Sequence, residues 1–170
     1  FYSRTTTGRP ATFSARQPFG QQYSSCYNDA SLKAVYPFGH GLTYSTIVYS
    51  NEKVRVEGGE AVFSADISNT GARDANELVQ VYVRANKASI ARPRRELKGF
   101  RRVALAPGKT AHVEIRLSVS SFGFFLDGGK FELPQSFTAW IAPDSDSGRP
   151  LSLDLRVGGI SGAIIEREIR

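Results

Sequence analysis

The sequence has no methionine, a single cysteine (Cys26) and only two histidines among its 170 residues. One cysteine excludes an internal disulfide, and two histidines with one cysteine leave no zinc-binding pattern. No apolar run approaches the ~20 residues of a membrane-spanning helix. We therefore expect no metal site, no cofactor and no membrane partner. The lack of methionine also predicts that Phe1 is a product of processing or the first residue of a piece of a longer chain.

The net charge of +6 is concentrated in one short segment. Residues 92–102 contain six arginines or lysines and one glutamate. A basic patch can bind phosphate backbones by releasing counterions, but only one potential stacking ring, Phe100, lies among these cations. We therefore expect a solvated loop, a charged strand edge that discourages aggregation, or a contact with an acidic partner surface, and no nucleic-acid partner.

The first 44 residues differ in composition from the rest of the chain. They contain nine of the nineteen aromatic residues but one acidic residue, Asp29, and they show neither a two-residue nor a 3.6-residue period. An aromatic segment without periodicity is too apolar for a free linker. We expect it to wrap over another surface and to fill pockets there with its rings. Without that surface, the rings would form an exposed apolar patch.

From Ile47 onward, apolar and polar residues alternate in short runs bounded by Gly, Pro, Asn and Asp, which is typical of β-strands. The apolar positions are Phe63, Ala65 and Ile67; Val79, Val81 and Val83; Val113, Ile115 and Leu117; Phe137, Ala139 and Ile141; and Leu151, Leu153, Leu155 and Val157. About seven such runs over roughly 110 residues predict an all-β fold. The expected architecture is a two-sheet antiparallel sandwich of the fibronectin type III or immunoglobulin kind, preceded by an extended aromatic-rich arm.

No group of residues in the sequence has the pattern of a catalytic site. His40 and His112 lie in different contexts, and His112 occupies an outward strand position. Residues 144–148 begin like a calcium-binding loop but lack the remaining ligands, so we expect a polar hairpin loop there. The glycines around His40 do not stand between a strand and a helix, which excludes a dinucleotide-binding loop. We therefore predict no catalytic residue in this chain.

The segment Tyr36–Tyr44, YPFGHGLTY, closely resembles the PFGxGLSY signature of glycoside hydrolase family 3, which contains β-glucosidases, β-xylosidases and exo-glucanases. Other segments resemble family segments in the same order. They are Thr7–Pro10 (similar to NTGRP, with Thr6 in place of Asn), Tyr27–Asp29, Asn69–Gly71 (NTG), Val79–Val83 (VVQLYV), Arg92–Phe100 (RPxKELKGF) and Leu105–Gly108 (LxPGE). One such segment would be weak evidence, whereas seven in order are strong.

The resemblance implies a position in a larger enzyme. Family members consist of a (β/α)₈-like barrel, an α/β sandwich domain and a fibronectin type III-like domain. Residues 1–44 would then be the end of the preceding α/β sandwich domain and a linker arm, 45–157 the fibronectin type III-like sandwich, and 158–170 a C-terminal tail. The family's nucleophilic aspartate and acid/base glutamate lie on the barrel and the α/β sandwich domain, upstream of anything that matches Phe1.

The expected function is therefore structural: this C-terminal segment would brace the catalytic domains of a retaining β-glycosidase, similar to a β-glucosidase, and would be inactive alone. Those upstream domains are its expected partners, and the carbohydrate substrate would bind to them. The residues predicted to pack between domains are Arg9, Tyr36, Pro37, Phe38, Gly39, Gly41, Leu42 and Tyr44. Enzymes of this kind are often periplasmic or secreted, and the same is expected here.

Two other functions are open at this point. The first is a freestanding carbohydrate-binding sandwich, which requires Trp140 and Tyr82 to stand exposed in a row. The second is an anion-binding module that uses the cations of residues 92–102, which requires binding to weaken with salt.

Overall fold

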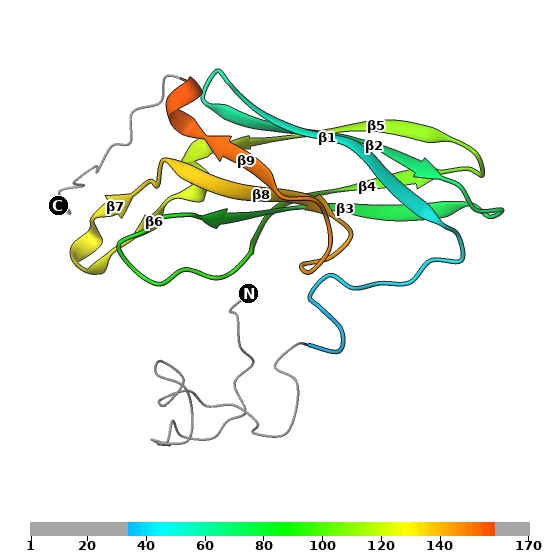
Figure 1. The fold of residues 1–170 in the computed structure, drawn as a ribbon, viewed down its shortest axis with the longest axis horizontal. Helices are drawn as coiled ribbons and strands as arrows, with labels where there is room; N and C mark the ends of the chain where they lie inside the picture. Colours follow the sequence, from blue (N-terminus) through cyan, green and yellow to red (C-terminus); the bar gives the residue numbers. More distant parts are fainter. Residues whose placement is uncertain (1–33, 159–170) are drawn as a thin grey trace.

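The computed structural model describes residues 34–158, with side chains described as far as Arg156 (Figure 1). Arg9, Cys26 and the tail beyond Gly158 lie outside the described residues, so the expectations that concern them stay predictions. The strands are β1 (Ile47–Glu57), β2 (Glu60–Asn69), β3 (Ala75–Ala85), β4 (Glu96–Leu105), β5 (Thr110–Ser118), β6 (Phe124–Phe125), β7 (Phe131–Glu132), β8 (Ser136–Ala142) and β9 (Leu151–Asp154). Three single-turn 3₁₀ helices lie at Val119–Phe122, Asp127–Gly129 and Leu155–Gly158.

Seven of the strands form two antiparallel sheets that face each other. One sheet has the order β1-β2-β5 and the other the order β4-β3-β8-β9, while β6 and β7 make a separate short hairpin. The two layers lie one above the other in Figure 1. This arrangement confirms the predicted all-β sandwich. No helix among the described residues is long and apolar enough to cross a membrane.

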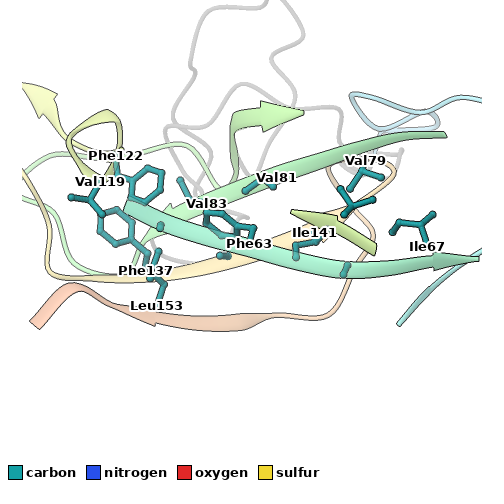
Figure 2. Packing of buried hydrophobic residues seen from close by; sticks show 14 of the residues in the cluster. Phe63, Ile67, Val79, Val81, Val83, Val119, Phe122, Phe137, Ile141 and Leu153 are labelled. Atoms are coloured by element: carbon teal, nitrogen blue, oxygen red, sulfur yellow. The ribbon is translucent and has the colours of Figure 1, made fainter. Parts of the chain in front are cut away.

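The core lies between the two sheets and is built from the alternating apolar positions of the strands. Phe63 and Ile67 on β2 face Val79, Val81 and Val83 on β3, as Figure 2 shows. Phe122, from the 3₁₀ helix after β5, packs with its ring centroid 5.5 Å from that of Phe137. Burial of a large apolar side chain contributes roughly 1.5–3 kcal/mol each to folding. The period of two therefore determines which face of each strand is covered.

The simple alternation breaks down on the central strand β3. Residues Val79 to Val83 are all buried, including the polar Gln80 and the outward-facing Tyr82. The alternating pattern would place these two side chains in solvent, but a loop from another part of the chain covers them.

A second difference from the expected pattern concerns the last apolar run, which was expected to stay extended as far as Val157. Strand β9 ends at Asp154, whose Oδ1 accepts a hydrogen bond from the backbone N–H of Arg156 and starts a 3₁₀ turn.

The turn after β2 is held by one buried amide. Asn69 has 1% of its surface exposed, and its Nδ2 donates to the carbonyl oxygens of Arg73 and Leu105 at 2.7 and 3.0 Å. Its Oδ1 accepts from the hydroxyl of Ser45 and from the backbone N–H of Gly71. One side chain therefore ties the approach to β1 to the ends of β2 and β4.

Candidate interdomain docking site

The segment Tyr36–Tyr44 runs along the outer face of the four-stranded sheet, on the side away from β1, β2 and β5 (Figure 1). Its backbone is hydrogen-bonded to the sandwich at two consecutive residues. The carbonyl oxygen of Phe38 accepts from the backbone N–H of Ser145 at 2.8 Å. The carbonyl oxygen of Gly39 accepts from Nε2 of Gln80 at 3.3 Å. The segment is therefore attached to both β3 and the hairpin that joins β8 to β9.

Gln80 is the centre of this attachment. Its Nε2 donates to the carbonyl oxygens of both Gly39 and Pro143. Its Oε1 accepts from the hydroxyl of Tyr82 at 2.6 Å. Among the described residues, no buried side-chain nitrogen or oxygen is without a hydrogen-bond partner. The nitrogen and the oxygen of this buried amide therefore both have partners, which offsets the cost of removing them from water.

The loop needs glycine where it approaches the sheet. The backbone N–H of His40 donates to the carbonyl oxygen of Pro37 at 3.0 Å, which closes a turn with Gly39 at its third position and a φ of +82°. Such a φ is typical of glycine in a type II turn. A Cβ at Gly39 would also collide with Oε1 of Gln80 and would lie 2.8 Å from the hydroxyl of Tyr82. At Gly41, by contrast, a Cβ would have nothing within 4 Å.

The loop's side chains point away from the sandwich, although its backbone is attached to it. Val35, Tyr36, Leu42 and Tyr44 are between 73% and 94% exposed, and Phe38 is 48% exposed. Tyr36 contacts the ring of His40, with centroids 5.2 Å apart. Seven of the eight predicted packing residues thus lie in one loop, in which the side chains of Tyr36, Leu42 and Tyr44 are largely uncovered. Arg9, the eighth, lies outside the described residues.

The hairpin between β8 and β9 is organised by its own aspartate. Oδ1 of Asp144 accepts hydrogen bonds from the backbone N–H groups of Asp146 and Ser147 at 2.9 and 2.8 Å. This places the N–H of Ser145 where Phe38 can use it. Burial, with the charge of Asp144 as a second cause, raises the pKa of the Tyr82 hydroxyl to about 12. The residues of the expected polar hairpin loop thus serve to hold the loop before β1.

The sequence pattern does not mark Gln80 or Ser145 as site residues, and it marks Tyr82 only as a ring that the carbohydrate-binding alternative would need exposed. Gln80 and Tyr82 occupy strand positions that alternate with valines, and the pattern assigns such positions to solvent. The only sequence signal for Gln80 and Tyr82 was their place inside the segment Val79–Val83 that resembles the family.

The two histidines are not brought together. His40 lies in the loop, whereas His112 lies on the three-stranded sheet and contacts Asp66 at 2.6 Å.

The basic segment is partly used inside the sandwich. Arg92 pairs with Glu96 at 2.6 Å and lies over the ring of Phe124. Arg95 lies 4.1 Å above the ring of Trp140 and donates to the carbonyl oxygen of Ser147. Lys98 pairs with Glu96 as well. Arg101 donates to the carbonyl oxygen of Glu114. Four of the six cations in residues 92–102 therefore have structural contacts, which weakens the case for an anion-binding module.

The structure contradicts the carbohydrate-binding alternative. Trp140 and Tyr82 lie opposite each other on β8 and β3, as a platform would require. However, they are only 6% and 0% exposed, because Arg95, the loop before β1 and the hairpin after β8 cover them. Two rings that solvent does not reach cannot stack on a sugar. The exposed aromatic row that the carbohydrate-binding alternative requires is therefore not formed by these residues.

Known proteins resemble this chain over most of its length. Residues 77–145 match the family model of the fibronectin type III-like domain. The periplasmic β-glucosidase of Salmonella typhimurium is 31% identical over 150 residues, which cover 85% of this chain and 19% of that protein. The β-xylosidase of Formosa agariphila is 32% identical over 141 residues, which cover 80% of this chain and 20% of that protein.

Solved structures give the same result. A β-glucosidase from Listeria innocua in complex with glucose superimposes with a TM-score of 0.72 at 28% identity, over 91% of this chain and 22% of that one. A GH3 β-glucosidase from Bifidobacterium adolescentis superimposes with a TM-score of 0.66 at 32% identity, over 70% of this chain and 18% of that one. The chain spans about a fifth of the length of the curated relatives that it matches.

Proposed function

We propose a bracing role for this chain, which belongs to glycoside hydrolase family 3 and corresponds to the fibronectin type III-like part of such enzymes. It is the C-terminal structural segment of a retaining β-glycosidase, most similar to β-glucosidases, that hydrolyses terminal β-linked sugars. The catalytic carboxylates belong to the preceding barrel and α/β sandwich domains, and the substrate binds there. The names of the relatives, β-glucosidase and β-xylosidase, support this activity.

One observation carries the bracing role: the Tyr36–Tyr44 loop has a fixed backbone and uncovered apolar side chains. Leu42 and Tyr44 are 94% and 91% exposed, although the backbone a few residues earlier is hydrogen-bonded to two elements of the sandwich. A loop held in this way presents its rings in one orientation at little entropic cost on docking. Neighbouring exposed apolar groups of this kind mark a protein interface.

The same reasoning supports a division of the chain. Residues 1–44 are the end of the preceding α/β sandwich domain and its linker arm, 45–157 are the fibronectin type III-like domain, and 158–170 are a C-terminal tail. Arg9, Pro37, Gly39 and Gly41 then belong to the interdomain contact with the exposed rings. We also infer a periplasmic or secreted enzyme, supported by the relative that is a periplasmic β-glucosidase.

An activity assay tests the division of roles. The purified 170-residue chain and the longer enzyme that contains it are each incubated with aryl β-glucosides and β-xylosides. We expect turnover only from the longer enzyme, because glycosidases need a pair of carboxylates that flank the scissile bond, and the proposal assigns both to the upstream domains. Turnover by the rigorously purified chain would contradict the proposal. A native molecular mass that shows the chain separate from the catalytic domains would contradict it as well.

The substitution Phe38→Ala tests the brace itself. Phe38 is 48% exposed in this chain and would be buried by the proposed interdomain contact. In the longer enzyme the substitution should therefore lower the melting temperature, because removal of a buried phenylalanine typically costs about 3–5 kcal/mol. KM for a small glucoside should change little. The matched control is Phe125→Ala, since Phe125 is 61% exposed in the β6–β7 hairpin and outside the loop. A large rise in KM at unchanged thermal stability would mean that Phe38 lines the sugar site instead.

A further inference from the structure

We propose that the outer face of β4 and β3, at Leu78, Phe100 and Arg102, docks onto an apolar, acid-rimmed surface of the domain that precedes residue 34 in the same enzyme. This inference rests on the bracing function above and adds to it the face of the sandwich that turns toward the catalytic domains. The opposing surface of the preceding domain would carry apolar groups surrounded by carboxylates.

The strand register places these side chains on one face. Phe100 lies directly opposite Gln80, and Arg102 directly opposite Leu78, in the pairing of β3 with β4. Residues opposite each other in an antiparallel pair project to the same side of the sheet. Because Val79 and Val81 point into the core, Gln80 and Leu78 mark the outer side. Phe100 is 65% exposed there and Leu78 37%.

This face continues the docking loop. The carbonyl oxygen of Gly39 accepts a hydrogen bond from Gln80, whose cross-strand neighbour is Phe100, so the docking loop and Phe100 meet at the same buried residue. The chain enters the described structure at Ala34, immediately before this loop, and 33 residues precede it. Figure 1 shows the loop on the side of the four-stranded sheet that faces away from the other sheet. A domain that leads directly into this loop would therefore meet this side of the sandwich first.

Charge indicates what the opposing surface contains. Arg102 and Arg94 are exposed, and no carboxylate among residues 34–158 lies within ion-pair distance of either. Arg101, on the other face of β4, donates to the carbonyl oxygen of Glu114. By contrast, Arg92 and Lys98 share Glu96. Exposed guanidinium groups beside an uncovered ring fit a partner that offers carboxylates around an apolar pocket.

The other outer face of the sandwich has no such surplus. On β1, β2 and β5 the charges neutralise one another: Arg55 pairs with Glu114 at 2.7 Å, and Arg116 with Glu114 at 3.3 Å. His112 contacts Asp66, which also accepts from Asn51 at 2.7 Å. The buried side chain of Val62 lies between Arg55 and Arg116 in the register. Because the charged side chains of this face already have ion-pair partners, the face can remain in contact with solvent. The outer face of β3 and β4 has exposed cations without such partners among residues 34–158, and it is therefore the face that we propose for docking.

A zero-length cross-linking experiment on the longer enzyme tests the proposal. The variant Arg102→Lys places a primary amine at this position, and a carbodiimide joins amines only to carboxylates in direct contact. We expect a cross-linked peptide pair between β4 and a carboxylate of the preceding domain, absent in the wild-type enzyme. Lys109, on the exposed turn between β4 and β5, is the internal control and should give no interdomain pair. Mixing ¹⁴N- and ¹⁵N-labelled enzyme distinguishes links within one chain from links between copies.

Stability measurements give a second, independent readout. Phe100→Ser and Arg102→Glu should each lower the melting temperature of the longer enzyme and increase amide exchange in the preceding domain. Two controls are matched in chemistry: Val48→Ser on the outer face of the three-stranded sheet, where Val48 is 44% exposed, and Lys109→Glu. Both controls should behave like the wild type.

The outcomes separate this proposal from the bracing function. If Phe38→Ala destabilises the enzyme while Phe100→Ser, Arg102→Glu and the cross-link show nothing, the docking face is wrong and the brace stands. If all three variants behave like the wild type, the brace itself is wrong. A cross-link only between copies, or only within residues 34–158, would also overturn the proposed partner.

Discussion

The hydroxyl of Tyr82 donates a 2.6 Å hydrogen bond to Oε1 of Gln80, two residues earlier on the same face of β3. This bond fixes the amide, because Nε2 of Gln80 must then point to the carbonyl oxygens of Gly39 and Pro143. A strand position, a turn in the arm and a hairpin loop are thus joined by one side chain. The orientation of the exposed loop depends on this pair.

Gln80→Glu should release the loop without changing the size of the side chain. The carboxylate has no hydrogen to donate, so the two carbonyl oxygens would face a negative charge, at a cost of about 1–3 kcal/mol for each group left unsatisfied. Urea unfolding of the 170-residue chain measures the loss, and amide exchange at Ser145 reports release of the loop. Asn76→Asp, an exposed amide on the same strand, is the control. Equal stability of the two variants would contradict the central role of Gln80.

Gly39→Ala and Gly41→Ala form a matched pair within one loop. At Gly39 the φ of +82° disfavours any L-residue by roughly 1–2 kcal/mol, and the added Cβ would collide with Gln80. At Gly41 nothing lies within 4 Å, so the same change should be nearly neutral. Thermal unfolding should therefore show a loss for the first variant alone. Similar melting temperatures would mean that the turn does not need its glycine.

Asn69→Ala should destabilise the sandwich more than its exposed neighbour Thr70→Ala does. The buried amide of Asn69 serves the carbonyl oxygens of Arg73 and Leu105, and both would lose their donor. Each unsatisfied buried group costs about 1–3 kcal/mol. Chemical denaturation gives the difference in free energy of unfolding. A smaller loss at Asn69 than at Thr70 would show that the turn does not depend on this amide.

Stability should fall at alkaline pH because of buried tyrosine hydroxyls. Burial raises the pKa of Tyr82 to about 12, against about 10 for a free tyrosine, and burial with a hydrogen bond to Glu77 raises that of Tyr49 as well. The folded chain therefore holds these protons more tightly than the unfolded chain. This contribution is complete below about pH 10 and is lost as pH rises toward about 12. Tyr82→Phe should flatten this dependence in urea titrations at several pH values, and an unchanged slope would contradict the assignment.

Several features of this protein follow from its sequence alone. A two-residue period needs only neighbouring residues to be read, because side chains of a strand point alternately to its two faces. The runs around Phe63, Val81, Val113 and Ile141 therefore predicted the strands and the core correctly. The segment Tyr36–Tyr44 likewise pointed to the family, which the comparisons support.

Tertiary structure alone decided which outward positions are solvated. On the three-stranded sheet, Asp66 and Arg116 meet solvent and pair with other surface charges. On the four-stranded sheet, Gln80 and Tyr82 have the same alternating pattern but lie beneath a loop some forty residues earlier in the chain. Local sequence does not encode such a contact, because it depends on where two distant segments meet and on whether every buried polar group finds a partner there. For the same reason, the pattern presented Trp140 as an exposed ring, whereas the fold covers it with Arg95.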